Sequence, residues 1–286
     1  MQTPDILFSL PPPVLDGLTQ YGEQLEEVHL RKGRPTELVV RRKAILLPYC
    51  ATDMDIQIIL DRATDYSLYT AEESLKEGFC TTRDGCRIGI AGTIVGQDGI
   101  IHGLREISSV NIRIAKQVFG LADCLVETLK REPGSVLIVG APGCGKTTLL
   151  RDVVRQISDR LGQRVGVADV RDELAGCHLG QPTMDVGCRT DILSGGSKEV
   201  CVMMLLRTMH PQWIAMDEIT DRSDVQALSR CAYCGVHLLA TAHAADLEEL
   251  RKRPVYRAVL WERMFRHLVE MTPDGGYEMR EMEAVL

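Results

Sequence analysis

The sequence is poor in aromatic residues and carries no excess of positive charge. Aromatic side chains make up 5% of its 286 residues, and the formal net charge is −7. Lys and Arg number 13 against 16 Asp and Glu in residues 1–118, and 20 against 24 in the remainder. Binding to duplex nucleic acid depends on basic side chains, and binding to single strands depends largely on aromatic ones. The composition therefore does not favour nucleic acid as a partner, although the basic stretch from Arg31 to Lys43 leaves a nucleic-acid-stimulated activity open.

The sequence also lacks a long hydrophobic run. Apolar stretches such as "SVLIVG" (135–140) fall well short of the roughly 20 residues that a membrane-spanning helix needs. The first ten residues have no basic start of the kind that a signal peptide carries. Together with ten cysteines, which we expect to be free thiols in a reducing compartment, these features predict a cytoplasmic protein.

Cysteine pairs of the kind that bind zinc are scarce. Cys231 and Cys234 form the single C-x-x-C of the sequence, whereas a structural zinc site usually needs two such pairs. We therefore interpret these two cysteines as small apolar side chains on a helix.

The length of the chain predicts two domains, with a boundary near residue 118. Residues 1–118 are expected to form a smaller α+β domain. Helical spacing places Met54, Ile56, Ile59 and Leu60 on one face of a helix, whereas alternation of apolar and polar residues predicts strands. The expected helices are 11–25, 53–64 and 70–78, and the expected strands lie in 26–49, 79–82, 87–96 and 111–116.

Residues 119–286 alternate between apolar strands and amphipathic helices. This alternation predicts an α/β domain with a parallel central sheet and right-handed crossovers. The last part, residues 258–282, is expected to form a terminal hairpin around "PDGG". Strands are predicted at 135–140, 164–170, 213–218 and 236–243, and helices at 120–132, 147–161, 198–209 and 221–234.

The stretch "GAPGCGKTTLL" (140–150) matches the P-loop pattern G-x-x-x-x-G-K-[ST], between an apolar strand and an amphipathic helix. Glycines let backbone N–H groups approach phosphate oxygens, and the helix N-terminus adds positive potential. Lys146 is expected to contact the β- and γ-phosphates, and Thr147 to offer its hydroxyl to Mg²⁺. The expected ATP-binding residues are Gly140, Ala141, Pro142, Gly143, Cys144, Gly145, Lys146, Thr147 and Thr148.

A second acidic element follows on another strand. "WIAMDE" (213–218) is an apolar strand that ends in Asp217 and Glu218. Asp217 is placed to hold Mg²⁺, and Glu218 is placed to act as the general base that polarises an attacking water. A P-loop followed by this pair predicts hydrolysis of the nucleotide, and the sequence lacks an N-K-x-D guanine-binding motif, which favours ATP.

Two further segments supply candidate side chains. The strand "VHLLATAH" (236–243) ends in His243, which is either a sensor of the γ-phosphate or a histidine at the edge of the core. In "VADVRDELAG" (167–176), Asp169 and Glu173 either point into the nucleotide cleft or belong to a solvated acidic loop.

The order of these motifs resembles that of the ATPases of type II and type IV secretion systems. The chain resembles even more closely the stage III sporulation protein AA family, nearly from end to end. The segments that carry this second resemblance are "RKGRPTELVV", "GCRIGIAG", "ISSVNIRIA", "APGCGKTTLLRD", "RDELAG", "MMLLRTMHP" and "MDEI".

The resemblance implies a RecA-like P-loop NTPase domain preceded by a smaller α+β domain, in a hexameric ring. It implies that His243 belongs to a histidine box, and that Asp169 and Glu173 are the carboxylates of an acidic box that departs from the usual pattern at Val170. It also implies that Arg105 and Arg113 sense phosphate within a subunit or across an interface, and the alternative for both is a salt bridge on the surface of the strands.

The resemblance further implies that this ATPase energises a transenvelope channel during sporulation, docked on membrane-embedded channel subunits from the cytoplasmic side. Two alternatives remain open at this stage. One is a P-loop ATPase that nucleic acid stimulates, and the other is a nucleotide-gated scaffold with little turnover.

Overall fold

The computed structural model describes residues 4–64, 78–97, 100–114, 117–178 and 180–282. The chain divides into two compact units. The first consists of residues 1–116 with 176–183, and the second of residues 117–175 with 184–286. No helix within the described ranges is long and apolar enough to cross a membrane.

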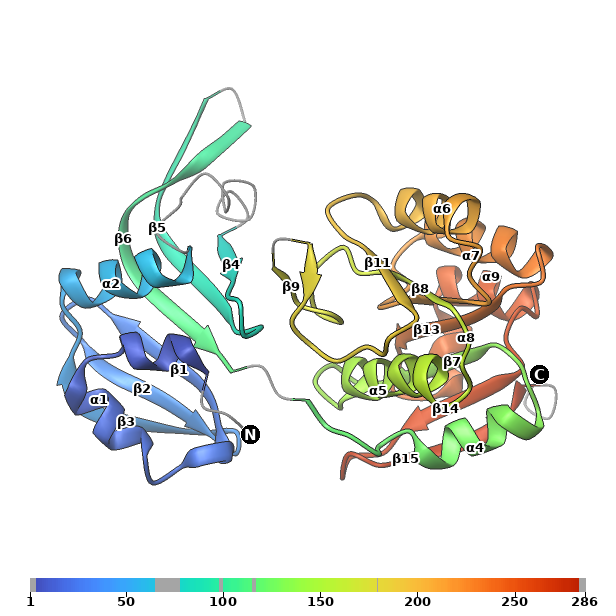
Figure 1. Cartoon of the computed structure of the whole chain (residues 1–286), viewed down its shortest axis with the longest axis horizontal. Coiled ribbons are helices and arrows are strands. Elements are labelled where there is room, and N and C mark those ends of the chain that lie inside the picture. Colours follow the sequence, from blue (N-terminus) through green and yellow to red (C-terminus); the bar gives the residue numbers. More distant parts are fainter. Residues whose placement is uncertain (1–3, 65–77, 98–99, 115–116, 179, 283–286) are drawn as a thin grey trace. The chain divides into compact units, whose positions relative to one another are not determined.

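The first unit is built on a six-stranded antiparallel sheet with the order β3-β2-β1-β6-β5-β4. Figure 1 shows α1 and α2, in blue, on one face of this sheet. The strands are β1 (Leu25–Arg31), β2 (Pro35–Val40), β3 (Lys43–Cys50), β4 (Phe79–Thr81), β5 (Arg87–Gln97) and β6 (Ile100–Arg113). The helical segments described are η1 (Asp5–Ser9), α1 (Pro12–Leu18), η2 (Gly22–Gln24) and α2 (Asp53–Ala63).

The core of the first unit lies between the sheet and these helices. Val28 and Leu30 of β1 are fully buried together with Ile56 and Ile59 of α2. The prediction that Met54 shares a helical face with Ile56 and Ile59 is wrong, because Met54 is 67% exposed. Two residues along a helix are about 200° apart, so Met54 lies on the face opposite Ile56. The helix expected at 70–78 falls almost entirely outside the described residues.

The second unit contains a seven-stranded sheet with the order β11-β8-β12-β13-β7-β14-β15. All neighbours pair in parallel except β14 and β15, which form the predicted terminal hairpin. The strands are β7 (Val136–Gly140), β8 (Val165–Ala168), β11 (Thr190–Leu193), β12 (Trp213–Met216), β13 (His237–His243), β14 (His267–Met271) and β15 (Tyr277–Glu281). A short pair, β9 (Cys177–His178) and β10 (Gln181–Pro182), belongs to the first unit.

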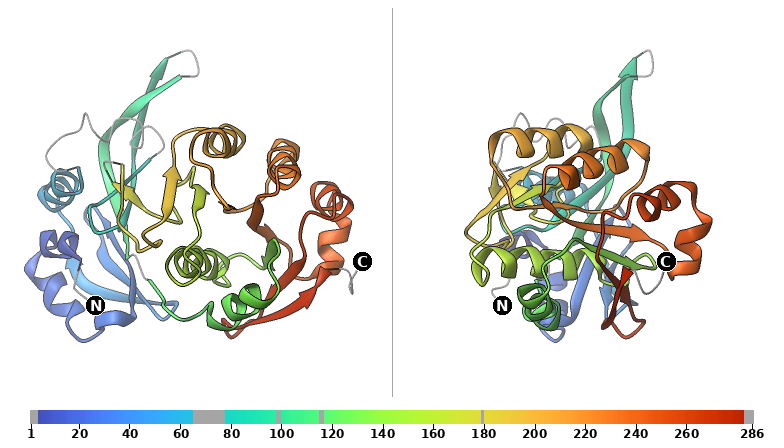
Figure 2. Two further views of the ribbon diagram at one scale, coloured as in Figure 1. Left: turned by 45° about the vertical axis from the view of Figure 1, so that its right-hand side comes forward. Right: turned by 90° about the vertical axis from the view of Figure 1, so that its right-hand side faces the viewer.

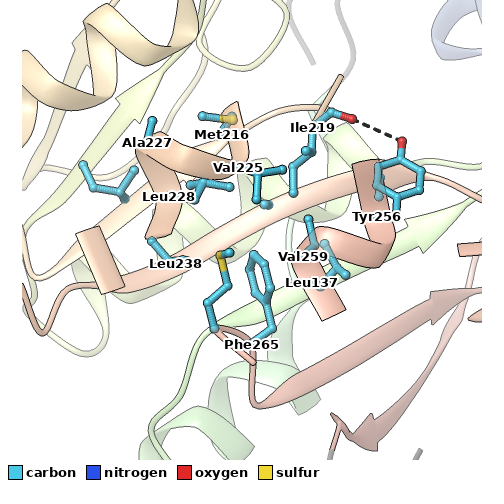
Figure 3. Close-up of a cluster of buried hydrophobic side chains, with 14 of the residues drawn as sticks. Leu137, Met216, Ile219, Val225, Ala227, Leu228, Leu238, Tyr256, Val259 and Phe265 are labelled. Atoms are coloured by element: carbon cyan, nitrogen blue, oxygen red, sulfur yellow. Dashed lines mark hydrogen bonds between the residues drawn. The ribbon is translucent and has the colours of Figure 1, made fainter. Parts of the chain in front are cut away.

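Helices cover both faces of the second sheet. Figure 2 shows α6, α7 and α9 on one face and α4 and α5 on the other. Figure 3 shows the core on the first of these faces, where Met216 of β12 packs with Leu228 and Val259. The helices are α4 (Asp123–Arg131), α5 (Lys146–Asp159), α6 (Lys198–Thr208), α7 (Arg222–Tyr233), α8 (Leu247–Lys252) and α9 (Pro254–Trp261).

The start predicted for the terminal hairpin is wrong. Residues 258–261 form the last turn of α9, and the first hairpin strand begins only at His267. Pro254 opens α9 at its first position, where a missing N–H costs nothing. Tyr256 and Leu260, four residues apart, both face the core, which is the spacing of a helix and not of a strand.

The parallel strands bring the candidate residues to one edge of the sheet. Gly140 at the end of β7 lies opposite His243 at the end of β13, and Met216 at the end of β12 lies opposite both Ala240 and Ala168. The residues that follow these strands therefore meet at the carboxyl edge, which is where α/β sheets bind their ligands.

Candidate nucleotide-binding site

The loop between β7 and α5 is held in a tight, glycine-dependent conformation. Gly143 and Gly145 have φ angles of 74° and 101°, in the left-handed region that glycine adopts without strain. A Cβ atom on Gly140 would lie 2.5 Å from the Cys144 Sγ atom and 2.8 Å from the Met271 Cβ atom. These three positions therefore require glycine, Gly143 and Gly145 because of their left-handed backbone and Gly140 because the Cys144 and Met271 side chains fill the space that a Cβ atom would take.

Lys146, at the start of α5, is buried with only 5% of its surface exposed. Its Nζ atom donates to the carbonyl oxygens of Gly140 at 2.8 Å and Ala141 at 2.9 Å, and it lies 3.0 Å from the Nδ1 atom of His243. Burial lowers the pKa of the Lys146 amine below its usual value, because the charged form loses solvation. Nearby acidic groups offset part of this effect, namely Cys144, Asp217 and Glu218.

His243 lies between this lysine and Glu218. An ammonium group can only donate, so the Nδ1 atom of His243 accepts from Lys146 and the ring hydrogen is on Nε2. The Nε2 atom lies 3.3 Å from the Glu218 Oε1 atom. His243 therefore connects the P-loop lysine to the carboxylate at the end of β12.

Asp217 is bound by two hydroxyl groups. Its Oδ2 atom accepts from Thr147 Oγ1 at 2.7 Å, and its Oδ1 atom accepts from Thr241 Oγ1 at 2.6 Å. Hydroxyl and carboxylate oxygens are the ligands that Mg²⁺ prefers, and Thr147 and Asp217 already lie in contact. The donor set at this point fits a magnesium ion bound directly or through water.

Glu218 has an unusual backbone and a paired side chain. Its φ angle is 56°, in the left-handed region that costs a residue with a Cβ atom about 1–2 kcal/mol. Its carboxylate lies 3.3 Å from both Arg171 Nη1 and His243 Nε2. Backbone strain of this kind is concentrated at functional sites, where surrounding contacts maintain it.

The two acidic-box residues have different surroundings. Asp169 is 2% exposed, and its carboxylate accepts from the backbone N–H groups of Glu173, Leu174 and Ala175 at 2.7–3.1 Å. Burial raises the pKa of Asp169, and these hydrogen bonds act against that rise. Glu173, in contrast, has an exposed side chain. Asp169 thus stabilises the loop on which Glu173 is carried.

Arg151 fixes the same loop from the other side. This arginine of α5 is 7% exposed, and it donates to the carbonyl oxygens of Leu174 at 2.5 Å and Glu173 at 2.6 Å.

The carboxyl edge also contains a small pocket. Its lining includes both acidic-box residues together with Arg171, Lys198, Asp217 and Glu218.

The structure brings together the predicted residues of the second unit but also places residues there that the sequence did not single out. Arg151, Arg171 and Lys198 are of this kind, because no pattern in the sequence assigned them a role, although Arg151 and Arg171 lie within segments that carry the family resemblance. The sequence did offer one indication for Lys198, because it follows the glycine-containing segment "GGS" (195–197) directly before a predicted helix. Among the described residues, no group of three or more His, Cys, Asp or Glu is arranged to bind a metal ion. Of the two cysteines of the C-x-x-C pair, Cys231 is buried and Cys234 is exposed.

The two candidate arginines of the first unit lie on β6. Arg113 is exposed, and its Nε atom lies 3.5 Å from Glu27 Oε1. Arg105 is also exposed and pairs through the backbone with Thr93 of β5.

The fold is the RecA-like α/β fold, preceded by an N-terminal domain, that is found in several ATPases. The ATPase DotB of Legionella pneumophila superposes with a TM-score of 0.61 over 97% of this chain and 81% of that chain, at 16% identity. The pilus retraction motor PilT with bound ADP superposes with a TM-score of 0.63 over 98% of this chain and 83% of that chain, at 15% identity. This agreement confirms the predicted fold class.

Within this class, the chain belongs to the sporulation stage III protein AA family, whose model matches residues 13–279. The stage III sporulation protein AA of Bacillus subtilis (strain 168) is 39% identical over 281 residues, which cover 95% of this chain and 92% of that protein. A plant relative, Protein SEEDLING PLASTID DEVELOPMENT 1 of Arabidopsis thaliana, is 26% identical over 86% of this chain but only 34% of its own length. The resemblance inferred from the sequence is confirmed.

Proposed function

We propose that this protein is a Mg²⁺-dependent ATP hydrolase. The observation that carries the proposal is the contact between Thr147 and Asp217 beneath a glycine-built loop, with Glu218 directly after Asp217. The loop from Gly140 to Thr148 fits a phosphate chain, and the oxygen ligands fit Mg²⁺. When bound, the metal ion supplies Lewis-acid stabilisation of charge on the phosphates.

The residues of the site divide the chemistry between them. Lys146 exchanges its bonds to two loop carbonyls and His243 for bonds to phosphate oxygens. Glu218 accepts the proton of the attacking water at a carboxylate oxygen, and the Nε2–H group of His243 orients that carboxylate. Glu173, at the exposed side of the pocket, supports the position of the metal or the water.

The biological role that we propose follows from the family. The relative in Bacillus subtilis is named a stage III sporulation protein, and the fold is shared with a pilus retraction motor. We infer that hydrolysis energises a sporulation-associated transenvelope channel. In this proposal the protein forms a cytoplasmic ring of six subunits, and the ring docks on membrane-embedded channel subunits. Residues 1–118 and 119–286 act as the N-terminal and ATPase domains, and Arg105 and Arg113 contact phosphates in the same or a neighbouring subunit.

The direct test is an ATPase assay on the purified full chain. We expect phosphate release with ATP and Mg²⁺, loss of release in excess chelator, and loss of both nucleotide binding and turnover in Lys146→Ala. The control Lys130→Ala, at an exposed lysine of α4, should retain wild-type activity. Absence of phosphate release from a folded wild-type protein that binds ATP would instead favour a nucleotide-gated scaffold.

A further inference from the structure

The backbone of Glu218 needs support on both of its sides. A residue with a Cβ atom is uncommon at a φ angle of 56° and stays there only if its neighbours hold it. The position matters because rotation of this backbone would move the carboxylate away from His243. The question is which side chains hold it.

The N–H group of Glu218 is held by Thr241. This N–H donates to Thr241 Oγ1 at 2.8 Å, and the same hydroxyl donates to Asp217 Oδ1. Thr241 is fully buried in β13. The amino side of Glu218 is therefore fixed to the neighbouring strand.

The C=O group of Glu218 is held by Lys198. The Nζ atom of this lysine, in the first turn of α6, donates to the carbonyl oxygen of Glu218. It also lies 3.5 Å from Thr220 Oγ1 and 3.6 Å from Asp224 Oδ2. The side chains of Lys198 and Asp224 are only 13% and 4% exposed, so this is an interior arrangement and not a surface ion pair.

Asp224 fixes the end of this lysine. Its Oδ2 atom accepts from both the backbone N–H and the hydroxyl of Thr220 at 2.9 Å. The lysine, the aspartate and the threonine thus lock the turn that follows Glu218. The Glu218 carboxylate itself takes no part in this network, because its basic neighbours are Arg171 and His243.

We propose that Lys198 is a positioning residue for Glu218, which fixes the carbonyl of the strained residue and so aims its carboxylate at the attacking water. This inference rests on the proposed function, in which Glu218 is the general base. It assigns to Lys198 a role that acts through Glu218 and not through the nucleotide.

The test compares Lys198→Met, Lys198→Arg and Lys130→Met in the full-length protein. Lys198→Met keeps the aliphatic chain but lacks the donor, and we expect its kcat to fall about 10- to 100-fold, as for a small misplacement of a catalytic group. The KM for ATP and the affinity for ADP should stay within about twofold of wild type, because the loop that binds phosphate is untouched. Lys198→Arg, which retains a donor, should recover most of kcat, and Lys130→Met should match wild type.

A second measurement tests whether Lys198 acts through Glu218. In a Glu218→Gln background, Lys198→Met should cause no further loss of kcat, since the group that it positions no longer functions. The proposal would be overturned if the loss of kcat in the double variant equalled the product of the two single losses. An unchanged kcat in a folded Lys198→Met variant would also overturn it. A wild-type protein without turnover would overturn the proposed function and this inference together, whereas loss in Glu218→Gln but not in Lys198→Met would overturn the inference alone.

Discussion

The Nδ1 atom of His243 lies 3.0 Å from the Nζ atom of Lys146, across the carboxyl edge of the sheet. This contact joins β13 to the first residue of α5 and fixes which ring nitrogen of His243 carries hydrogen. The lysine that is expected to meet phosphate is thereby already paired with His243 and with its own loop, and ATP must replace these bonds.

The buried amine of Lys146 predicts a pH-dependent effect on stability. Its pKa is lowered in the folded protein, so the folded state binds fewer protons than the unfolded state between the lowered pKa and the usual value of 10.5. The cost of burying the charged lysine is therefore complete below the folded pKa and disappears as pH rises toward 10.5.

Lys146→Met removes this cost. We expect the Tm of Lys146→Met minus that of wild type to be largest near pH 7 and to shrink as pH rises above the folded pKa of Lys146. Lys130→Met, at an exposed position, serves as the control for general effects of lost charge. A difference that does not change with pH would contradict the lowered pKa.

The left-handed backbone of Glu218 predicts that glycine at this position gives a more stable protein than alanine, the reverse of the usual order. Glu218→Gly and Glu218→Ala remove the same carboxylate, but only glycine adopts a φ angle of 56° without strain. We expect Glu218→Gly to be more stable than Glu218→Ala by about 1 kcal/mol in denaturant unfolding. The opposite order, which is usual inside helices and strands, would show that this backbone conformation is not maintained.

The two acidic-box residues are predicted to affect different quantities, Asp169 the stability of the fold and Glu173 the rate of hydrolysis. Asp169→Ala leaves three backbone N–H groups without their buried acceptor, so we expect a loss of about 2–4 kcal/mol in the free energy of unfolding. Glu173→Gln, at an exposed side chain, should change stability by less than about 0.5 kcal/mol but should lower kcat. Equal losses of stability in both variants would refute this division of roles.

The buried thiols are expected to resist modification. Burial raises the pKa of both Cys80 and Cys231 to about 12, so their reactive thiolate is scarce near pH 8. The exposed Cys50, Cys124, Cys188 and Cys234 should be labelled before them by a maleimide reagent in the native protein. Mass spectrometry of digested samples checks the order, and native labelling of Cys231 ahead of Cys234 would contradict it.

Shared sites in a ring can be tested by mixing two inactive proteins. If Arg113 completes the site of a neighbouring subunit, Arg113→Ala and Lys146→Ala should each lose turnover, while a mixture should recover part of it. An arginine that stabilises a transferring phosphate contributes about 10³–10⁵ in rate, so recovery is measurable above background. If subunits exchange and the mixture is still as inactive as its components, Arg113 does not complete the site of a neighbouring subunit. It would then act in the site of its own subunit or take no part in the site.

The sequence predicted the parts of the site that depend on local motifs. Gly140 to Thr148 and the Asp217–Glu218 pair were recognised because each motif is contiguous and follows an apolar strand. Arg151 and Lys198 were not, because each binds carbonyl groups 20 or more residues away, a contact that only the folded chain creates. Met54 was misplaced for a different reason, since hydrophobicity alone did not settle its angular position on α2.

The central claim is that Glu218 is the general base of an ATP hydrolase, and single-turnover hydrolysis by Glu218→Gln tests it most directly. This substitution keeps the size of the side chain and its contact with His243 but removes the basic carboxylate. We predict that the variant binds ATP with Mg²⁺ as tightly as wild type and hydrolyses it about 10²- to 10⁴-fold more slowly. Hydrolysis at the wild-type rate by a folded, ATP-bound Glu218→Gln variant would contradict the account.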